Sequence, residues 1–232
     1  MAELEIGKYP LIALPLDDRD LESKLSQAKS KGIDLIELRI DMFSSTQSDY
    51  VKDISRKVKD SGFGIIGTVR SVEEGGLKDL KDSERIELFE AVSDYADIID
   101  IELRSERLHE DLVKLCRDKE KFLLVSYHDF EKTPSEDEIQ EIIDRSSFGD
   151  IIKFAFMVKD VEDVGRILSV THKNRDKKIV SIGMGDLGKI TRVAGFFFGS
   201  LITYTYIGES VAPGQIEVKE LIKELKFYGL RS

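Results

Sequence analysis

A lysine inside an apolar segment is the residue of this sequence with the strongest chemical potential. Lys153 lies within Ile151–Met157, where every other residue is apolar. Burial of an ammonium group is costly unless the charge is paired or neutralised, so such a lysine is either an ion-pair partner or a reactive group. We expect desolvation and nearby arginines to lower the pKa of Lys153, which gives a free amine that attacks carbonyl carbons.

A histidine at the end of another predicted strand could carry protons for this lysine. His128 ends the segment Phe122–His128, whereas His109 and His172 lie in charged segments of helical pattern. Imidazole exchanges protons near neutral pH, which suits it to general acid and base catalysis. A lone histidine is more often structural, so the functional interpretation of His128 depends on its proximity to Lys153.

Charged residues alternate along the segment Leu35–Asp41. Glu37, Arg39 and Asp41 stand at every second position, so their side chains point to the same face of a strand. Helices cover the outer face of a parallel barrel sheet, which leaves little solvent on either side of a strand. The alternation therefore indicates that these three side chains point into a barrel interior.

Two neighbouring predicted strands carry further charges at their carboxyl ends. Arg70 ends one strand and precedes a loop with Gly75 and Gly76, and glycine permits a close approach of backbone to ligand. Asp100 and Glu102 stand two residues apart on the next strand. Each of these side chains either contacts a ligand or pairs with a neighbouring charge.

Two later segments have the composition of an anion-binding site. Met184–Arg192 combines a glycine-rich turn with a helix start, where backbone N–H groups and Arg192 suit a carboxylate or a phosphate. Phosphate is the usual ligand at this position of a barrel. Ala212–Gln215 follows the last predicted strand and is either a simple turn or a mobile loop that closes over a substrate.

Eight short apolar or alternating segments predict the strands that hold these residues. They are Leu11–Leu16, Asp34–Asp41, Gly64–Arg70, Ile98–Leu103, Phe122–His128, Ile151–Val158, Ile179–Met184 and Leu201–Ile207. The stretches between them, such as Asp20–Lys31 and Glu136–Arg145, space apolar residues three or four apart and are rich in Lys and Glu, as surface helices are.

This alternation predicts an α/β fold in which residues 1–232 form a single (β/α)8 TIM-barrel domain. An open doubly wound sheet is the alternative, but no Gly-x-Gly-x-x-Gly turn follows the first strand. In a barrel the carboxyl ends of all strands converge on one pocket. The charged residues described above stand at those ends.

Composition narrows the classes of function. The formal net charge of −10 argues against sequence-independent nucleic-acid binding, and the lone Cys116, without a Cys and His cluster, argues against a disulfide or a metal site. The longest apolar stretch, Gly195–Gly208, is too short to span a bilayer, and Gly195–Gly199 within it is expected to form a buried helix. Because Met1–Tyr9 does not resemble a signal peptide, we expect a cytoplasmic protein.

The motifs together resemble the type I 3-dehydroquinate dehydratase family of the shikimate pathway. They are Glu-x-Arg-x-Asp at 37–41, Thr-x-Arg-x-x-x-Glu-Gly-Gly at 68–76, Ser-x-His-x-Phe at 126–130, Lys153, Met184-Gly185, Thr191-Arg192 and Pro213-Gly214-Gln215. The resemblance covers nearly the whole chain. It implies a lyase with a TIM-barrel fold that needs no metal, nucleotide or prosthetic group.

The resemblance also implies the catalytic residues. Lys153 would form a Schiff base with the C3 ketone of 3-dehydroquinate, and His128 would act as general base and acid in the loss of water that gives 3-dehydroshikimate. Glu74 would assist near His128. Asp100, with Glu102 beside it, is expected to support the site from behind and to orient the imidazole of His128.

Seven residues are expected to bind the substrate. They are Glu37, Arg39 and Arg70 at ring hydroxyls, Arg192 and Gln215 at the carboxylate, and Met184 and Val211. Val211 departs from the family pattern, in which Ser or Thr usually precedes Ala-Pro-Gly-Gln, because valine has no hydrogen-bond donor in its side chain. This departure predicts a weaker affinity for the substrate.

Two other functions are compatible with the same residues. A Schiff-base aldolase or transaldolase acting on a sugar phosphate would share Lys153, although the set of His128, Arg192 and Gln215 argues against it. A barrel that binds a metabolite without turnover is the second alternative, which the presence of both Lys153 and His128 disfavours. Homodimers are common in this family and among barrel enzymes, so a homodimer is expected.

Overall fold

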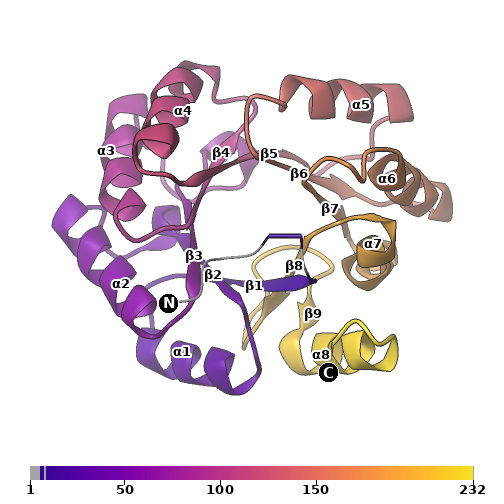
Figure 1. Cartoon of the computed structure of the whole chain (residues 1–232), viewed down its shortest axis with the longest axis horizontal. Helices are drawn as coiled ribbons and strands as arrows, with labels where there is room; N and C mark the ends of the chain where they lie inside the picture. Colours follow the sequence, from indigo (N-terminus) through magenta and orange to yellow (C-terminus); the bar gives the residue numbers. More distant parts are fainter. Residues whose placement is uncertain (1–5, 8, 232) are drawn as a thin grey trace.

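The strands form a central ring and the helices surround it (Figure 1). This computed structural model describes residues 6–7 and 9–231, so most of the segment Met1–Tyr9, considered above as a possible signal peptide, lies outside the described residues. The strands are β1 (Leu11–Leu16), β2 (Leu35–Arg39), β3 (Gly64–Thr68), β4 (Ile98–Glu102), β5 (Phe122–Asp129), β6 (Ile151–Met157), β7 (Ile179–Met184), β8 (Ile202–Tyr206) and β9 (Ile216–Glu217).

The helices alternate with the strands and lie outside the ring (Figure 1). They are α1 (Leu21–Ser30), α2 (Ser48–Asp60), α3 (Asp82–Ser93), α4 (His109–Asp118), α5 (Glu136–Arg145), α6 (Val161–Lys173), α7 (Thr191–Phe198) and α8 (Val218–Phe227). No helix in the described part of the chain is long and apolar enough to cross a bilayer.

Every strand pairs in parallel with its neighbours, which is the pattern that alternating strands and helices predict. The order in the sheet is β7-β6-β5-β4-β3-β2-β1-β8-β9. The ring closes between β7 and β8 through a parallel bridge from Ile179 to Ser200, beside which the Leu201 N–H donates to the Ile179 carbonyl oxygen at 2.9 Å. These pairings confirm the predicted barrel. The short β9, which we did not predict, pairs only with the end of β8.

The inner face of the ring changes from apolar to polar along the strands. The apolar residues near the amino ends of β2 to β6 are Leu35, Ile66, Ile98, Leu124 and Ile151, and all are fully buried. Since side chains on one face recur at every second residue, the next inward positions on these strands are Glu37, Thr68, Asp100, Ser126 and Lys153. The barrel therefore presents a layer of polar side chains above an apolar plug.

The second strand is shorter than predicted, which changes the position of Asp41. A 3-10 turn over Ile40–Met42 follows β2, so Asp41 leaves the inner face on which the alternation had placed it. Its carboxylate accepts hydrogen bonds from Arg39 Nε and Nη2 at 2.9 and 2.8 Å. Asp41 thus holds the side chain of Arg39 and does not face the pocket, so our prediction for Asp41 was wrong.

Three aspartates clamp pairs of strands at the amino-terminal end of the barrel. Asp34, just before β2, accepts the N–H of Ile12 on β1 at 2.8 Å. In the same way Asp97 accepts the N–H of Ile65 on β3 at 2.9 Å, and Asp150 accepts the N–H of Leu123 on β5 at 2.8 Å. These bonds fix the offset between neighbouring strands, and with it the relative heights of their inward side chains.

The segment Gly195–Gly199 is less buried than expected. Phe197 on α7 is 58% exposed, and its ring meets that of Tyr228, which is 49% exposed, at a centroid distance of 6.3 Å. Phe227, next to Tyr228, is 79% exposed. The expectation of a buried helix is therefore wrong for Phe197, because α7 turns this side chain towards α8 and solvent.

Replacement of Asp97 tests the strand clamp. Asp97→Ala removes the acceptor of the Ile65 N–H and the partner of Lys59, whose Nζ lies 2.7 Å from Asp97 Oδ1. We expect a loss of about 1–3 kcal/mol in the free energy of unfolding, measured with urea, because a backbone donor loses its partner. Asp79→Ala, at an exposed loop position, is the control. Equal stability of both variants would contradict a clamping role.

Candidate active site

The predicted catalytic and substrate-binding residues line one cavity at the carboxyl ends of the strands. Its volume is about 140 Å³, and a wider hollow of about 450 Å³ adjoins it and shares Arg39 and Val211. The predicted residues along the cavity are Glu37, Arg39, Arg70, Glu74, His128, Lys153, Met184, Arg192, Val211 and Gln215. Asp100 and Glu102 do not line it; both are fully buried and bond to Arg70 in its wall.

Lys153 and Arg70 share the carboxylate of Asp100. The Lys153 Nζ lies 3.0 Å from Asp100 Oδ2, and Arg70 Nη2 donates to the same oxygen at 2.9 Å. Ser126 Oγ donates to the other oxygen at 2.6 Å, so both oxygens of Asp100 are occupied. Glu37 adds a second carboxylate 3.7 Å from Lys153 Nζ.

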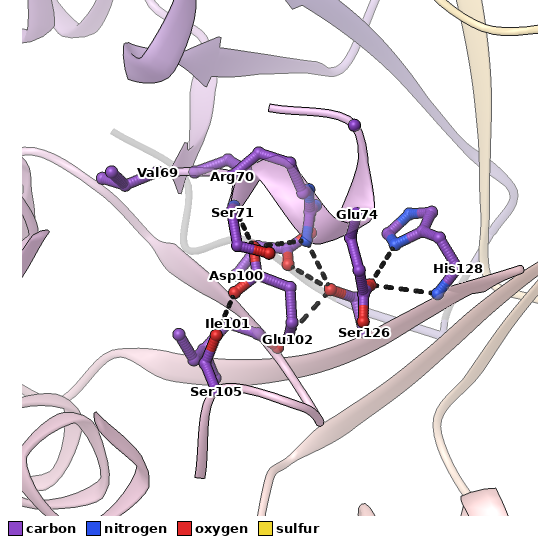
Figure 2. Close-up of polar contacts among 12 residues, drawn as sticks. Val69, Arg70, Ser71, Glu74, Asp100, Ile101, Glu102, Ser105, Ser126 and His128 are labelled. Carbon is purple, nitrogen blue, oxygen red and sulfur yellow. Dashed lines mark hydrogen bonds and ion pairs between the residues drawn. The ribbon is translucent and has the colours of Figure 1, made fainter. Parts of the chain in front are cut away.

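Glu102 extends this cluster to a third cation. Arg70 Nη1 and the Ser71 N–H donate to Glu102 Oε1 at 3.2 and 2.9 Å (Figure 2). Arg85 Nη2 donates to Glu102 Oε2 at 2.6 Å. We call the whole cluster the buried ionic network: Glu37, Arg70, Arg85, Asp100, Glu102 and Lys153. Its three carboxylates balance its three cations, which offsets the cost of taking six charges out of water.

The expected low pKa of Lys153 is wrong. Burial lowers the pKa of Lys153, but the carboxylates of Asp100 and Glu37 outweigh burial and hold the pKa above its ordinary value. In turn, although burial raises the pKa of Asp100, Arg70 and Lys153 hold it well below its usual range. The resting lysine is therefore an ammonium ion, which must release a proton before it can attack a carbonyl carbon.

Glu74, and not Asp100, holds the imidazole of His128 (Figure 2). Glu74 Oε2 lies 2.8 Å from His128 Nδ1 and also accepts the backbone N–H of His128 at 3.0 Å. Arg104 Nη1 donates to the His128 carbonyl oxygen at 3.1 Å and lies 3.5 Å from Glu74 Oε1. The expectation that Asp100 orients His128 is wrong, because Asp100 is already bonded to Arg70, Ser126 and Lys153.

The surroundings of His128 keep its imidazole neutral. Burial and the positive charges of Arg70 and Lys153 hold the pKa of His128 well below its ordinary value. Burial also raises the pKa of Glu74 to about 8. When Glu74 is ionised, the Nδ1–H of His128 donates to it and Nε2 keeps a free lone pair, which is the form that accepts a proton.

A tight turn after β3 places Glu74 beside His128. The Gly76 N–H donates to the Ser71 carbonyl oxygen at 2.8 Å, and a Cβ on Gly76 would collide with the carbonyl oxygens of Arg70 and Ser71. Arg39 Nη2 braces the same turn through the Gly75 carbonyl oxygen at 3.3 Å. Gly76, predicted to permit a close approach of backbone to ligand, instead permits a close approach between two backbone segments, and Gly75 has a φ of 88°, which glycine adopts readily.

Arg192 holds the loop that carries Gln215. Its Nε and Nη2 donate to the carbonyl oxygens of Gly214 and Pro213 at 2.7 and 3.2 Å. Burial lowers the pKa of Arg192 to about 10. The side chain of Gln215 turns back within the loop, where its Oε1 accepts the Val211 N–H at 2.8 Å. Val211 itself is 39% exposed and lines the mouth of the cavity.

Several residues of the site were not predicted from the sequence. Thr68 donates to Glu37 at 3.0 Å, Arg85 and Ser126 belong to the contacts of the network, and Arg104 braces His128. The signal for Thr68 and Ser126 was present, since both occupy the inward position that follows a buried apolar residue on their strands. Tyr204, which lines the cavity from β8, carries the same signal.

Removal of the lysine charge tests the electrostatic coupling in this site. Because the positive charge of Lys153 lowers the pKa of His128, we expect Lys153→Met to raise that pKa, as measured by NMR titration of the histidine rings. The ring signals of His109 and His172, on α4 and α6, serve as internal references in the spectra. An unchanged titration of His128 in the variant would contradict the coupling.

Known proteins are similar in sequence to this chain over nearly its whole length. The 3-dehydroquinate dehydratase of Aquifex aeolicus is 43% identical over 222 residues, which cover 95% of this chain and 100% of that protein. The protein of the same name from Methanocaldococcus jannaschii is 40% identical over 223 residues, which cover 93% and 97%.

Solved structures give the same result. The crystal structure of the Aquifex aeolicus enzyme has a TM-score of 0.87 at 41% identity and covers 94% of this chain and 98% of that one. The type I enzyme of Clostridium difficile has a TM-score of 0.89 at 30% identity, with 96% and 94% covered. The family model for type I 3-dehydroquinase matches residues 12–232, and the chain therefore belongs to that family.

Proposed function

We propose that this protein is a 3-dehydroquinate dehydratase that forms a Schiff base between Lys153 and its substrate, with His128 as general base and acid. The observation that carries the proposal is that Lys153 and His128 line the same cavity and that a carboxylate holds each of them. Lys153 Nζ is held 3.0 Å from Asp100, and His128 Nδ1 is held 2.8 Å from Glu74, which leaves Nε2 for the substrate. The relatives named above supply the identity of that substrate.

The first step joins Lys153 to the C3 ketone of 3-dehydroquinate. One proton leaves the ammonium ion, the neutral amine attacks the carbonyl carbon, and the carbonyl oxygen departs as water. Overall, ammonium and ketone give a protonated imine and one water molecule. The neutral imidazole of His128, which lines the same cavity, is the acceptor for the transient proton.

The second step removes a proton from C2. His128 Nε2 takes the proton, and the electron pair of the C–H bond moves into the protonated imine, which becomes a neutral enamine. The enamine then expels the C1 hydroxyl, which leaves as water with the proton from His128. Hydrolysis of the remaining imine releases 3-dehydroshikimate and restores Lys153. The imine lowers the barrier because no free enolate charge develops.

Arg192 and Gln215 are suited to the substrate carboxylate. Arg192 has five N–H donors, and the structure commits three of them to the carbonyl oxygens of Tyr204, Pro213 and Gly214. The remaining N–H groups and the amide nitrogen of Gln215 are available to an anion. Glu37, Arg39 and Arg70 face the same cavity and are assigned to the ring hydroxyls, with Met184 as an apolar wall.

The reaction proposed here uses only groups of the chain itself. Among residues 6–7 and 9–231 no cluster of three or more His, Cys, Asp or Glu side chains could hold a metal ion. A cytoplasmic location stays a prediction from the sequence of Met1–Tyr9. A homodimer also stays a prediction, for which the exposed aromatic cluster of Phe197, Phe227 and Tyr228 offers an apolar surface.

Turnover of 3-dehydroquinate tests the proposed function. The wild-type protein is expected to produce the ultraviolet absorbance of a conjugated product, and Lys153→Met is expected to lose at least about a thousandfold in rate because no imine can form. Lys159→Met, an exposed lysine just beyond β6, is the matched control and should keep full activity. Cleavage of sugar phosphates in place of dehydration would favour the aldolase alternative, and tight binding without turnover would favour the non-catalytic one.

A second test concerns the loop residue Val211. Val211→Ser and Val211→Thr place a hydroxyl at the mouth of the cavity, where it can donate to an anionic substrate. We expect the substrate Kd to fall by about threefold to tenfold, the range for one hydrogen bond. Val161→Ser, on the exposed start of α6, is the control. A Kd unchanged by both substitutions at Val211 would show that this position does not limit affinity.

A further inference from the structure

Tyr204 places an uncommitted hydroxyl group inside the buried ionic network. Its side chain is 4% exposed, its ring lies 4.4 Å from Lys153 Nζ, and its Oη is buried without a hydrogen-bond partner among the described residues. A buried hydroxyl without a partner costs free energy in the resting protein. Phenylalanine would supply the same ring without this cost, so the hydroxyl calls for a role outside the resting state.

Glu37 is the carboxylate that can use this hydroxyl. Tyr204 on β8 and Glu37 on β2 are separated by β1, whose residues Ala13 and Pro15 pair with them and are small. Burial raises the pKa of Tyr204, the positive charge of Lys153 opposes this, and the negative charges of Glu37 and then Asp100 add to the rise. Glu37 accepts one short hydrogen bond, from Thr68, and its contact with Lys153 Nζ is a looser 3.7 Å. Asp100, in contrast, has both oxygens filled.

The chemistry proposed for Lys153 changes the number of donors that surround these carboxylates. An ammonium ion has three N–H groups and can serve both Asp100 and Glu37, whereas a protonated imine has one. Asp100, at 3.0 Å from Nζ, is placed to keep that one, and Glu37 then loses its contact with Lys153. A buried carboxylate that loses a donor is destabilised, which raises the barrier to imine formation.

We propose that Tyr204 is a positioning residue whose hydroxyl donates a hydrogen bond to Glu37 when Lys153 becomes an imine. The inference rests on the Schiff base of the proposed function. Tyr204 makes and breaks no bond in the reaction. Its ring lies beside Lys153 Nζ, and its hydroxyl compensates Glu37 for the donor that Lys153 gives up. The hydroxyl is therefore without a partner at rest and bonded in the covalent intermediate.

The test compares wild-type protein, Tyr204→Phe and the control Tyr228→Phe, which removes a half-exposed hydroxyl beyond α8. Each protein is mixed with 3-dehydroquinate, quenched with borohydride at increasing times, and analysed by intact mass and peptide mapping for the adduct on Lys153. Melting temperature and substrate KM are measured in parallel. These two readouts separate a structural or binding defect from a slower covalent step.

Tyr204→Phe is expected to form the adduct about tenfold more slowly, the effect of one hydrogen bond to a charged group, with an unchanged KM and an equal or higher melting temperature. An adduct rate equal to that of the wild type overturns the inference, as does a slower rate accompanied by a lower melting temperature. If the wild type itself forms no adduct on Lys153, the Schiff base and this inference both fail. Normal trapping in wild type and Tyr204→Phe alike overturns the inference alone.

Discussion

The site depends on the balance of charge in the buried ionic network. Asp100 joins Lys153 and Arg70 through hydrogen bonds, and Glu102 joins Arg70 to Arg85, so each cation is held by a carboxylate that the barrel buries completely. Loss of one member of a buried pair leaves an uncompensated charge and costs roughly 3–5 kcal/mol. The network therefore ties the position of the amine to the stability of the fold.

The barrel supplies this network through the period of its strands. Each of β2 to β6 contributes one apolar residue to the plug and, two positions later, one polar residue to the layer above it. The parallel register brings these polar residues to similar heights, and the aspartates at the amino ends keep that register. Residues one further step along, such as Arg70 and His128, then reach the cavity. The pairing of the strands therefore determines the geometry of the catalytic residues.

The charges around the cavity have opposite effects on the protonation of Lys153 and of His128. The carboxylates hold Lys153 as an ammonium ion, and burial together with the cations holds His128 as a neutral base. A positioned acid and a positioned base at rest are the starting point that imine formation requires, because the proton released by the amine has an acceptor nearby. Burial raises the pKa of Glu74 to about 8, and its Oε2 lies 2.8 Å from His128 Nδ1. When Glu74 is ionised, it accepts the Nδ1 proton and so selects the imidazole form with a free Nε2.

The sequence predicted the barrel and the cavity residues better than it predicted their partners. Period-two alternation placed Glu37 and Arg39 on an inner face, whereas Lys153 stood out in an apolar strand and His128 at a strand end. The carboxyl ends of the strands converge in any barrel. Alternation cannot show where a strand ends, which is why Asp41 was misplaced. It also cannot show which inward charges on different strands reach one another.

The errors about Lys153 and Asp100 have that common origin. The pKa of Lys153 is set by carboxylates on β2 and β4, whose distance from β6 depends on barrel register. The orienting partner of His128 comes from the turn after β3, whose path depends on a contact between two backbone segments at Gly76. Neither the pKa of Lys153 nor the partner of His128 can therefore be predicted from the residues next to them in the sequence.

The most direct measurement is a titration of the Lys153 ammonium group by nitrogen NMR on protein labelled at lysine side chains, with Lys153→Met to assign the signal. If the carboxylates of Asp100 and Glu37 control the amine, Lys153 stays protonated to a pH above the ordinary lysine pKa of about 10.4. A midpoint well below that value would show that burial and the arginines dominate, and would contradict the role assigned to the buried ionic network.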